Sequence, residues 1–275
     1  MRDARAQPEF DIFDGIIHII DGSFEGLLTS VFVSHAEKRF PSAIYQKDEY
    51  QQSLYDAPRE IATDGVKAGR VRNGIINKLG AGVYENMWTA YLSCDTERYS
   101  KISRYLELAF KVGKGVTERL AEKAVMDILA INRNVGRETN KLVGFLRFSV
   151  MENNVQFAEI TPEHNQIPLL MQHFADRLQE IPFVIFDSGR QIAGIYDAKE
   201  WYIADARGLK MPNLAEDEEL IRRLWKQFYK TIAVEARVNK KLQRNNMPKR
   251  YWRNMTEHQP GDDAAGGPFL GSGSA

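Results

Sequence analysis

The fold is decided by residues 145–160, which read FLRFSVMENNVQFAEI. Apolar and polar residues alternate in both halves of this stretch, and the turn-forming residues MENN lie between the halves at 151–154. This pattern predicts a β-hairpin. A segment with helical spacing follows at 167–178, and three more strand-like segments follow it, at 183–186, 192–196 and 201–204. The order ββαβββ predicts a small antiparallel sheet.

The residues on either side of this sheet have a helical period. Residues 16–20 are a β-branched run, which predicts one leading strand, and residues 24–40 continue at helical spacing. Residues 42–63 are mixed and polar, so we expect a connecting segment there. From about residue 65 to residue 142 the spacing is helical again, which predicts a bundle. The predicted fold class is α+β, with an N-terminal α-helical bundle, a small antiparallel sheet and a long basic C-terminal helix.

Five parts are expected along the chain. They are a loose N-terminus at 1–9, a mainly helical region with one leading strand at 10–142, a sheet region at 143–210, a basic C-terminal helix with an aromatic-basic extension at 211–257, and a disordered tail at 258–275.

The composition excludes several classes of protein. The 275 residues are 43% hydrophobic, which is too apolar for a chain that is disordered throughout. The single cysteine, Cys94, cannot form an internal disulfide or a CxxC metal site, which favours a reducing cytoplasm. No stretch approaches the roughly 20 apolar residues that span a bilayer, so we expect no membrane helix. Lys and Arg number 37, as do Asp and Glu, which leaves no net charge.

The expected C-terminal helix, residues 217–244, separates its charges from its apolar side chains. Its apolar residues form one arc, which we expect to pack against the core of the protein. An arc that is buried in this way cannot bind a membrane. On the other side lie seven cations along roughly 30 Å of helix: Arg223, Lys226, Lys230, Arg237, Lys240, Lys241 and Arg244. Residues 221–253 hold 11 Lys and Arg but one acidic residue, so they carry +10 and the rest of the chain −10.

This basic stripe favours contact with the phosphates of a nucleic acid. A solvated face, a face paired with acidic residues elsewhere, or an acidic partner or membrane surface would give the same pattern. The next segment, PKRYWR at 248–253, interleaves Lys249 and Arg250 with Tyr251 and Trp252. Such a segment suits phosphate contact and stacking on an unpaired base, so single-stranded or damaged DNA is the favoured partner. Alternatively, Tyr251 and Trp252 pack the end of the chain onto the bundle.

Candidate catalytic residues are few. His164 and Asn165 lie in a polar turn before the helix of the sheet region, where anions are favoured. Alternatively, Thr161 or Asn165 caps the helix and His164 binds a loop carbonyl, which is the interpretation that we favour. Arg137 and Arg147 could form a second wall of a basic groove or pair with acidic surface residues. Together with His173 they are candidates for a pocket between bundle and sheet. Gly113-Lys114-Gly115 has the layout of a helix-hairpin-helix, or of an ordinary helix cap and turn.

The sequence indicates no metal site and no cofactor. The five histidines include no HExxH and no pair at ligand spacing on a helix. The P-loop and dinucleotide-binding glycine patterns are absent as well.

Several short blocks in a fixed order resemble a known bacterial family. They are DGSFEGLLT at 21–29, FKVG at 110–113, VGRE at 135–138, LVGFLRF at 142–148, PEHN at 162–165, PLL at 168–170, HFADR at 173–177, YD at 196–197, EWY at 200–202 and PKRYW at 248–252. Together they resemble the family labelled "probable DNA metabolism protein", over about residues 16–257. The resemblance implies a radical-SAM protein as partner and, because some members are fused to a uracil-DNA-glycosylase-like domain, a link to that activity. It implies no catalytic residue.

Three hypotheses follow from the sequence. The first is a cytoplasmic nucleic-acid-binding accessory protein in DNA repair or base modification, whose radical-SAM or glycosylase partner performs the chemistry. The second is an enzyme acting directly on a DNA base or nucleotide in a pocket between bundle and sheet. The third is a scaffold that binds only a partner enzyme, through its acidic surface.

Overall fold

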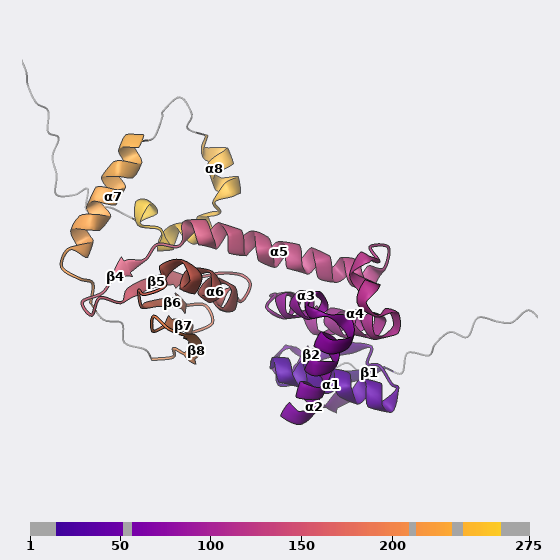
Figure 1. Cartoon of the computed structure of the whole chain (residues 1–275). Helices are drawn as coiled ribbons and strands as arrows, with labels where there is room; N and C mark the ends of the chain where they lie inside the picture. Colours follow the sequence, from indigo (N-terminus) through magenta and orange to yellow (C-terminus); the bar gives the residue numbers. More distant parts are fainter. Residues whose placement is uncertain (1–14, 52–56, 209–212, 233–238, 260–275) are drawn as a thin grey trace, which may run out of the picture. The chain divides into compact units, whose positions relative to one another are not determined.

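The computed structural model describes residues 15–51, 57–208, 213–232 and 239–259 (Figure 1). The chain forms two compact units, Met1–Gly136 and Arg137–Ala275, and the boundary falls within helix α5, Lys123–Phe145. The α+β class predicted from the sequence is confirmed, since helices and sheets occur together in both units.

The first unit contains a parallel sheet of strand order β2-β1-β3. Strand β1, Ile16–Ile20, is the predicted leading strand and lies in the middle with its last four residues buried. Strands β2, Ala43–Gln46, and β3, Ala57–Glu60, fall in the segment that was expected only to connect. That expectation was wrong. The sequence does not reveal these strands because both are only four residues long, and β3, with the sequence APRE, is exposed throughout and so shows no apolar alternation.

Helices make up the rest of the first unit. They are α1, Phe24–Glu37; α2, Gly65–Gly74; the π-helical turn Ile75–Leu79; α3, Ala81–Tyr91; α4, Arg98–Val112; and the first part of α5. Ser23 caps α1 by accepting a 2.9 Å hydrogen bond from the Gly26 amide, and Asp64 caps α2. Gly113 is followed by a 3-10 helix, Lys114–Glu118, and α5 begins only at Lys123. The prediction of a helix-hairpin-helix at Gly113-Lys114-Gly115 is therefore wrong.

The second unit contains a five-stranded sheet with the strands in sequence order. They are β4, Ser149–Val150; β5, Gln156–Ile160; β6, Phe183–Asp187; β7, Ile192–Tyr196; and β8, Trp201–Asp205. With helix α6, Ile167–Leu178, between β5 and β6, the predicted order ββαβββ is present. The sheet is mixed rather than antiparallel, because β5 and β6 pair in parallel across the α6 crossover. The first strand was predicted at residues 145–150, but only β4 is a strand in the structure, and α5 continues to Phe145.

Helix α6 packs on β6, β7 and β8 (Figure 1). The approach is closest at Gly194, where a Cβ atom would lie 2.3 Å from the Met171 Sδ, so no larger residue fits without movement. The two edges of the sheet differ. At the β4 edge, the Ala215 amide donates a 3.0 Å hydrogen bond to the Val150 carbonyl. At the β8 edge, three side chains are 38% to 52% exposed: Trp201, Tyr202 and Ile203.

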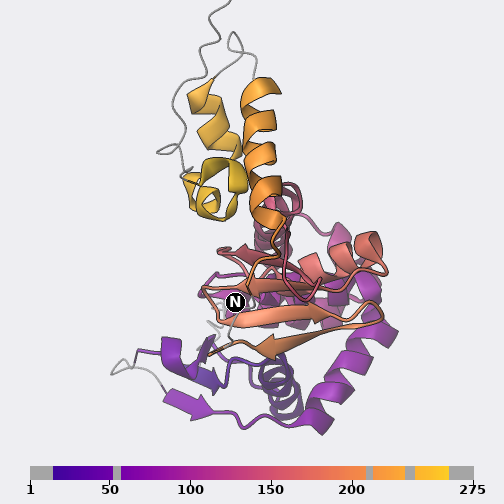
Figure 2. The same cartoon turned by 90° about the vertical axis from the view of Figure 1, so that its left-hand side faces the viewer.

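The C-terminal basic region contains two described helices, α7, Glu218–Ile232, and α8, Lys240–Asn246. One continuous helix over 217–244 was predicted, but Asn239 has the extended backbone of an N-cap, with φ −127° and ψ 90°. Two 3-10 turns follow, Lys249–Asn254 and Thr256–His258, and the second packs against α7 (Figure 2). No helix among the described residues combines the length and the apolar character that a bilayer crossing requires.

Candidate nucleic-acid interface

Helix α7 is held to the sheet by its first two turns. Glu218 is only 4% exposed; its carboxylate accepts a 3.0 Å hydrogen bond from the Val150 amide and pairs with Arg222. Arg222 donates a second hydrogen bond, 2.6 Å long, to the Ser149 Oγ. Because both residues bind strand β4, the start of α7 is positioned by the sheet.

The apolar arc of α7 is exposed in the described structure. The sequence led us to expect this arc in the core, but five of its side chains are between 39% and 61% exposed: Leu220, Ile221, Leu224, Trp225 and Phe228. The first unit and the sheet form their cores from other residues. The argument against a surface-binding role for this arc is therefore wrong.

The predicted basic stripe is divided among several elements. Arg223 is exposed on α7 and Lys226 is half-buried there, whereas the Lys230 side chain and Arg237 lie outside the described residues. Lys240, Lys241 and Arg244 are exposed on α8, and Lys249 is exposed at the start of the following turn. Within the described chain, none of the five exposed cations Arg223, Lys240, Lys241, Arg244 and Lys249 forms an ion pair with a carboxylate.

The buried carboxylate of Glu138 contacts the 3-10 turn Lys249–Asn254, which follows α8. Glu138, on α5, is 4% exposed and accepts hydrogen bonds from the backbone amides of Glu163, at 3.0 Å, and His164, at 2.8 Å. The Tyr251 hydroxyl donates a third hydrogen bond, of 2.8 Å, and Arg250 pairs with the same carboxylate at 3.3 Å. Because a buried charge is costly unless it is paired and hydrogen-bonded, these partners explain why Glu138 can lie inside.

Arg250 and Tyr251 therefore have structural partners. Arg250 pairs with Glu163 as well as Glu138, and its guanidinium lies 4.8 Å over the Tyr251 ring. Tyr251 is 3% exposed, and burial raises its pKa to about 12. The prediction that Tyr251 stacks on an exposed base is wrong, because its ring is packed inside the second unit, as the alternative interpretation had it.

Trp252 and Arg253 complete the turn. Trp252 is half-buried, stacks on His258 with ring centroids 4.5 Å apart, and donates a 2.9 Å hydrogen bond to the Met247 carbonyl. One face of the indole is therefore already occupied. Arg253 pairs with Glu159 of β5 at 3.1 Å. The turn thus binds the sheet and α5 through most of its side chains.

Arg147 joins α7 to the last turn of the described chain. It pairs with Glu257 at 2.8 Å, and its guanidinium lies 5.6 Å over the ring of Trp225, which itself donates to Glu257. Burial alone would raise the pKa of Glu257, but the hydrogen bonds from Arg147 and Trp225 hold it below its usual value. Of the two roles predicted for Arg147 from the sequence, a wall of a basic groove or a pair with an acidic residue, the structure shows the pair.

The remaining candidate catalytic residues differ in exposure and in their hydrogen-bond partners. Arg137 is exposed on α5 and His164 is buried beside Glu138. Asn165 Oδ1 and His173 Nε2 are buried without a hydrogen-bond partner among the described residues. Neither the cavity in this unit nor the larger cavity of the first unit is lined by any of the five candidates: Arg137, Arg147, His164, Asn165 and His173. The one in this unit, beside Tyr251 and Asn254, has a volume of about 10 Å³, enough for a single water molecule.

Glu138 is the residue that sequence reasoning missed. Counted from Ile131, the positions Val135, Glu138 and Leu142 recur at intervals of 4, 3 and 4, and the three apolar residues are all buried. An acid on the apolar side of a helix requires buried donors, so this spacing could have identified it. Among the residues that the structure describes, no three His, Cys, Asp or Glu side chains are grouped so that they could hold a metal ion.

Comparison with known proteins finds one family. A model described as a domain of unknown function, DUF4130, matches residues 96–257, more than half of the chain. The matched region begins before α4 and ends at Glu257, so it includes the Glu138 network, α7, α8 and the turn. No curated protein matches the chain.

Proposed function

The chain belongs to the DUF4130 family of domains of unknown function, and we propose that it is a cytoplasmic nucleic-acid-binding accessory protein. The surface formed by α7, α8 and Lys249 would hold the phosphate backbone. The resemblance to the "probable DNA metabolism protein" family suggests DNA repair or base modification as the process. A radical-SAM protein or a uracil-DNA-glycosylase-like protein would then perform the chemistry.

The observation that carries this proposal is the uneven neutralisation of the basic region. Among its 11 Lys and Arg residues, Arg222, Arg250 and Arg253 pair with carboxylates. The five exposed cations Arg223, Lys240, Lys241, Arg244 and Lys249 have no such partner in the described chain. Exposed cations that form no ion pair within the described chain suit a polyanion better than they suit solvent alone.

The number of cations sets the expected salt dependence. Each neutralised phosphate contributes a slope of about −0.7 on single strands or about −0.9 on duplex DNA in a plot of log K against log salt. Five contacts would therefore give a slope of about −3.5 to −4.5. Sequence preference would be weak, because phosphate contacts carry no base information and Tyr251 is not available for stacking.

The test compares two triple variants by fluorescence anisotropy with labelled single-stranded and duplex DNA. The first replaces three cations of α8, as Lys240→Gln, Lys241→Gln and Arg244→Gln. The control makes the same charge change at three exposed cations on other elements, as Arg72→Gln, Arg177→Gln and Lys199→Gln. We expect the α8 variant to lower affinity at least about tenfold and to reduce the slope by about 2 to 3, and the control to change affinity less than about threefold. Absence of binding at low salt, or equal loss in both variants, would overturn the proposal.

A second candidate function is a scaffold for the partner enzyme, favoured by the exposed apolar arc of α7. Leu224 and Phe228 are 61% and 53% exposed, which is unusually high for large apolar side chains. If this arc binds a radical-SAM partner, Leu224→Gln with Phe228→Gln, which adds no charge beside Arg223, would abolish binding to the purified partner and leave DNA affinity nearly unchanged. Unchanged partner binding would remove the scaffold function. The enzyme hypothesis stays a prediction.

A further inference from the structure

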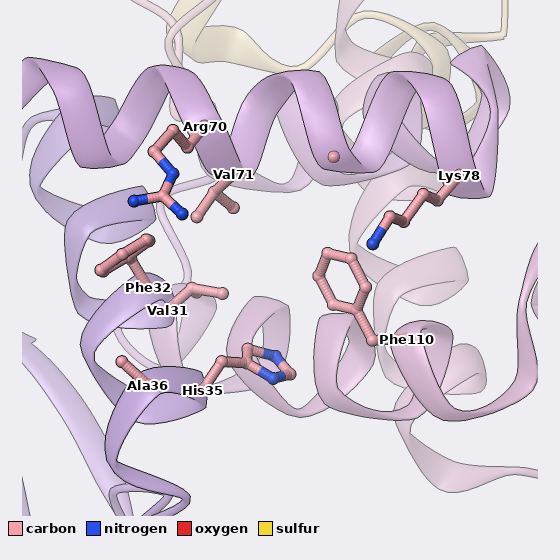
Figure 3. Close-up of a pocket in the computed structure, with 9 residues that line it drawn as sticks. Val31, Phe32, His35, Ala36, Arg70, Val71, Lys78 and Phe110 are labelled. Atoms are coloured by element: carbon pink, nitrogen blue, oxygen red, sulfur yellow. The ribbon is translucent and has the colours of Figure 1, made fainter.

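The first unit contains an open cavity of about 440 Å³ between helices (Figure 3). Helix α2 and the π-helical turn Ile75–Leu79 form one wall, α1 forms the second, and Phe110 of α4 forms the third. The volume lies within the range of about 300–1,000 Å³ that is typical of small-molecule sites. The family match begins at residue 96, so α1 and α2 lie outside it.

The cavity carries two cations and no acid. Figure 3 shows Arg70 and Lys78 extending from the α2 wall toward the opposite helices. The Arg70 guanidinium lies 4.9 Å over the Phe32 ring, which holds its plane in a defined position. The residues that line the cavity include no Asp or Glu, and in the described chain neither cation forms an ion pair. An anion entering the cavity would therefore meet two unneutralised donors.

The other walls are aromatic and aliphatic. Phe32 and Phe110 face the cavity from different helices, and Val31 and Val71 lie between them (Figure 3). His35 stands edge-on to Phe110 with ring centroids 5.0 Å apart. Burial lowers the pKa of His35, so the imidazole is neutral at pH 7 and acts as a further ring rather than as a third cation. These walls suit a flat apolar body rather than a bare inorganic ion.

The π-helical turn aligns the two cations. In a regular α-helix, positions 70 and 78 would be about 80° apart around the axis. The turn closes with an i→i+5 hydrogen bond from the Gly80 amide to the Ile75 carbonyl, 3.0 Å long, and such a wider turn rotates less per residue. Lys78 is thereby brought toward the line of Arg70 and Gly74. π-Helical turns occur frequently at functional sites.

We propose that this cavity binds an aromatic ring system joined to a phosphate, the chemistry of a nucleoside monophosphate. Phe32, Phe110 and His35 would contact the ring, and Arg70 and Lys78 would bind the phosphate. The site uses none of the residues of the basic region of the second unit, so the two proposals stand or fall independently.

Calorimetry of the full chain with four nucleoside monophosphates, their nucleosides and inorganic phosphate tests the ligand class. We expect at least one monophosphate to bind with a submillimolar Kd, and its nucleoside and inorganic phosphate to bind at least about tenfold more weakly. If no monophosphate binds at millimolar concentration, the proposal is wrong. A nucleoside that binds as tightly as its monophosphate, or inorganic phosphate that does so, would equally overturn it.

Two glycines of α2 provide matched variants that locate the site. Gly74 lines the cavity and Gly69 does not, and at both positions a new Cβ would meet no atom within 4 Å. We expect Gly74→Leu to fill the cavity and abolish binding, and Gly69→Leu to leave the Kd within about twofold. Arg70→Gln and Lys78→Gln should each weaken binding about fivefold or more. Equal effects of the two glycine variants would contradict the proposed location, and the α8 triple variant should leave nucleotide binding unchanged.

Discussion

Two neighbouring parts of the basic C-terminal region resemble each other in sequence and differ in structure. The turn Lys249–Asn254 and helices α7 and α8 both combine cations with large apolar side chains. In the turn, Arg250 and Arg253 pair with carboxylates and Tyr251 is buried. In the helices, the cations and the apolar side chains are both largely exposed.

The role of a cation therefore depends on the acidic side chains that the fold brings to it. Glu138 lies 113 positions before Tyr251 in the chain, yet the two side chains share a 2.8 Å hydrogen bond. The turn is thus part of the structural core of the second unit, whereas α7 and α8 remain open to a partner. The following predictions test this division, in order of decreasing effect.

Glu138→Ala should have the largest effect. It leaves the Tyr251 hydroxyl and two backbone amides without their acceptor and Arg250 without its buried partner. We expect the free energy of unfolding in urea to fall by about 3–5 kcal/mol. Glu180→Ala removes an exposed acid from the same unit and should cost less than about 0.5 kcal/mol. Similar losses in both variants would refute the central role of Glu138.

Tyr251→Phe removes a single hydroxyl from the network. The ring stays packed, but the buried Glu138 carboxylate loses one donor, so we expect a loss of about 2 kcal/mol in the same urea experiment. The effect on DNA affinity should be small. A variant with unchanged stability would mean that the hydrogen bond from the Tyr251 hydroxyl to Glu138 does not stabilise the fold.

Arg250→Gln and Arg244→Gln compare one arginine from each part. Arg250 binds Glu138 and is 37% exposed, so its loss should lower the free energy of unfolding by about 1 kcal/mol and change the salt slope of DNA binding little. Arg244 is exposed on α8, so its replacement should leave unfolding unchanged and reduce the slope by about 1. If both variants change the same quantity, the division between the two parts is wrong.

Leu224→Gln should have the smallest effect on stability. The side chain is 61% exposed, so the change should alter the free energy of unfolding by less than about 0.5 kcal/mol. Leu142→Gln, at a position 2% exposed in the core of the same unit, serves as the comparison and should cost several kcal/mol. A loss above about 1.5 kcal/mol at Leu224 would mean that the apolar arc of α7 is covered in the folded chain.

Much of the fold could be predicted because its signals are local. The hairpin turn, the period of α6 and the β-branched run of β1 each lie within a few residues of sequence. Strands β2 and β3 could not be recognised, because they are short and β3 has no buried side chain. The parallel pairing of β5 and β6 could have been inferred from the intervening helix, since a crossover of that length returns in parallel.

The candidate interface was harder to predict because burial depends on distant partners. Counting charges along the sequence identified the basic region, and two of its cations, Lys240 and Lys241, are exposed in the structure. The same counting could not separate Arg250 from Arg244, because only the folded chain brings Glu138 and Glu163 to Arg250. Helical spacing identified the apolar side of α7 but could not tell whether the core would cover it.

The unequal edges of the five-stranded sheet bear on how the protein behaves in concentrated solution. The β4 edge is closed by backbone hydrogen bonds with Asn213, which accepts, and Ala215, which donates, whereas β8 is the outer strand on the opposite side. Its exposed side chains are Trp201, Tyr202 and Ile203. Exposed apolar edge strands promote pairing between molecules, and lysine in such a strand opposes it. We therefore expect crowded samples to self-associate through β8, and a single Ile203→Lys substitution to keep the protein dispersed.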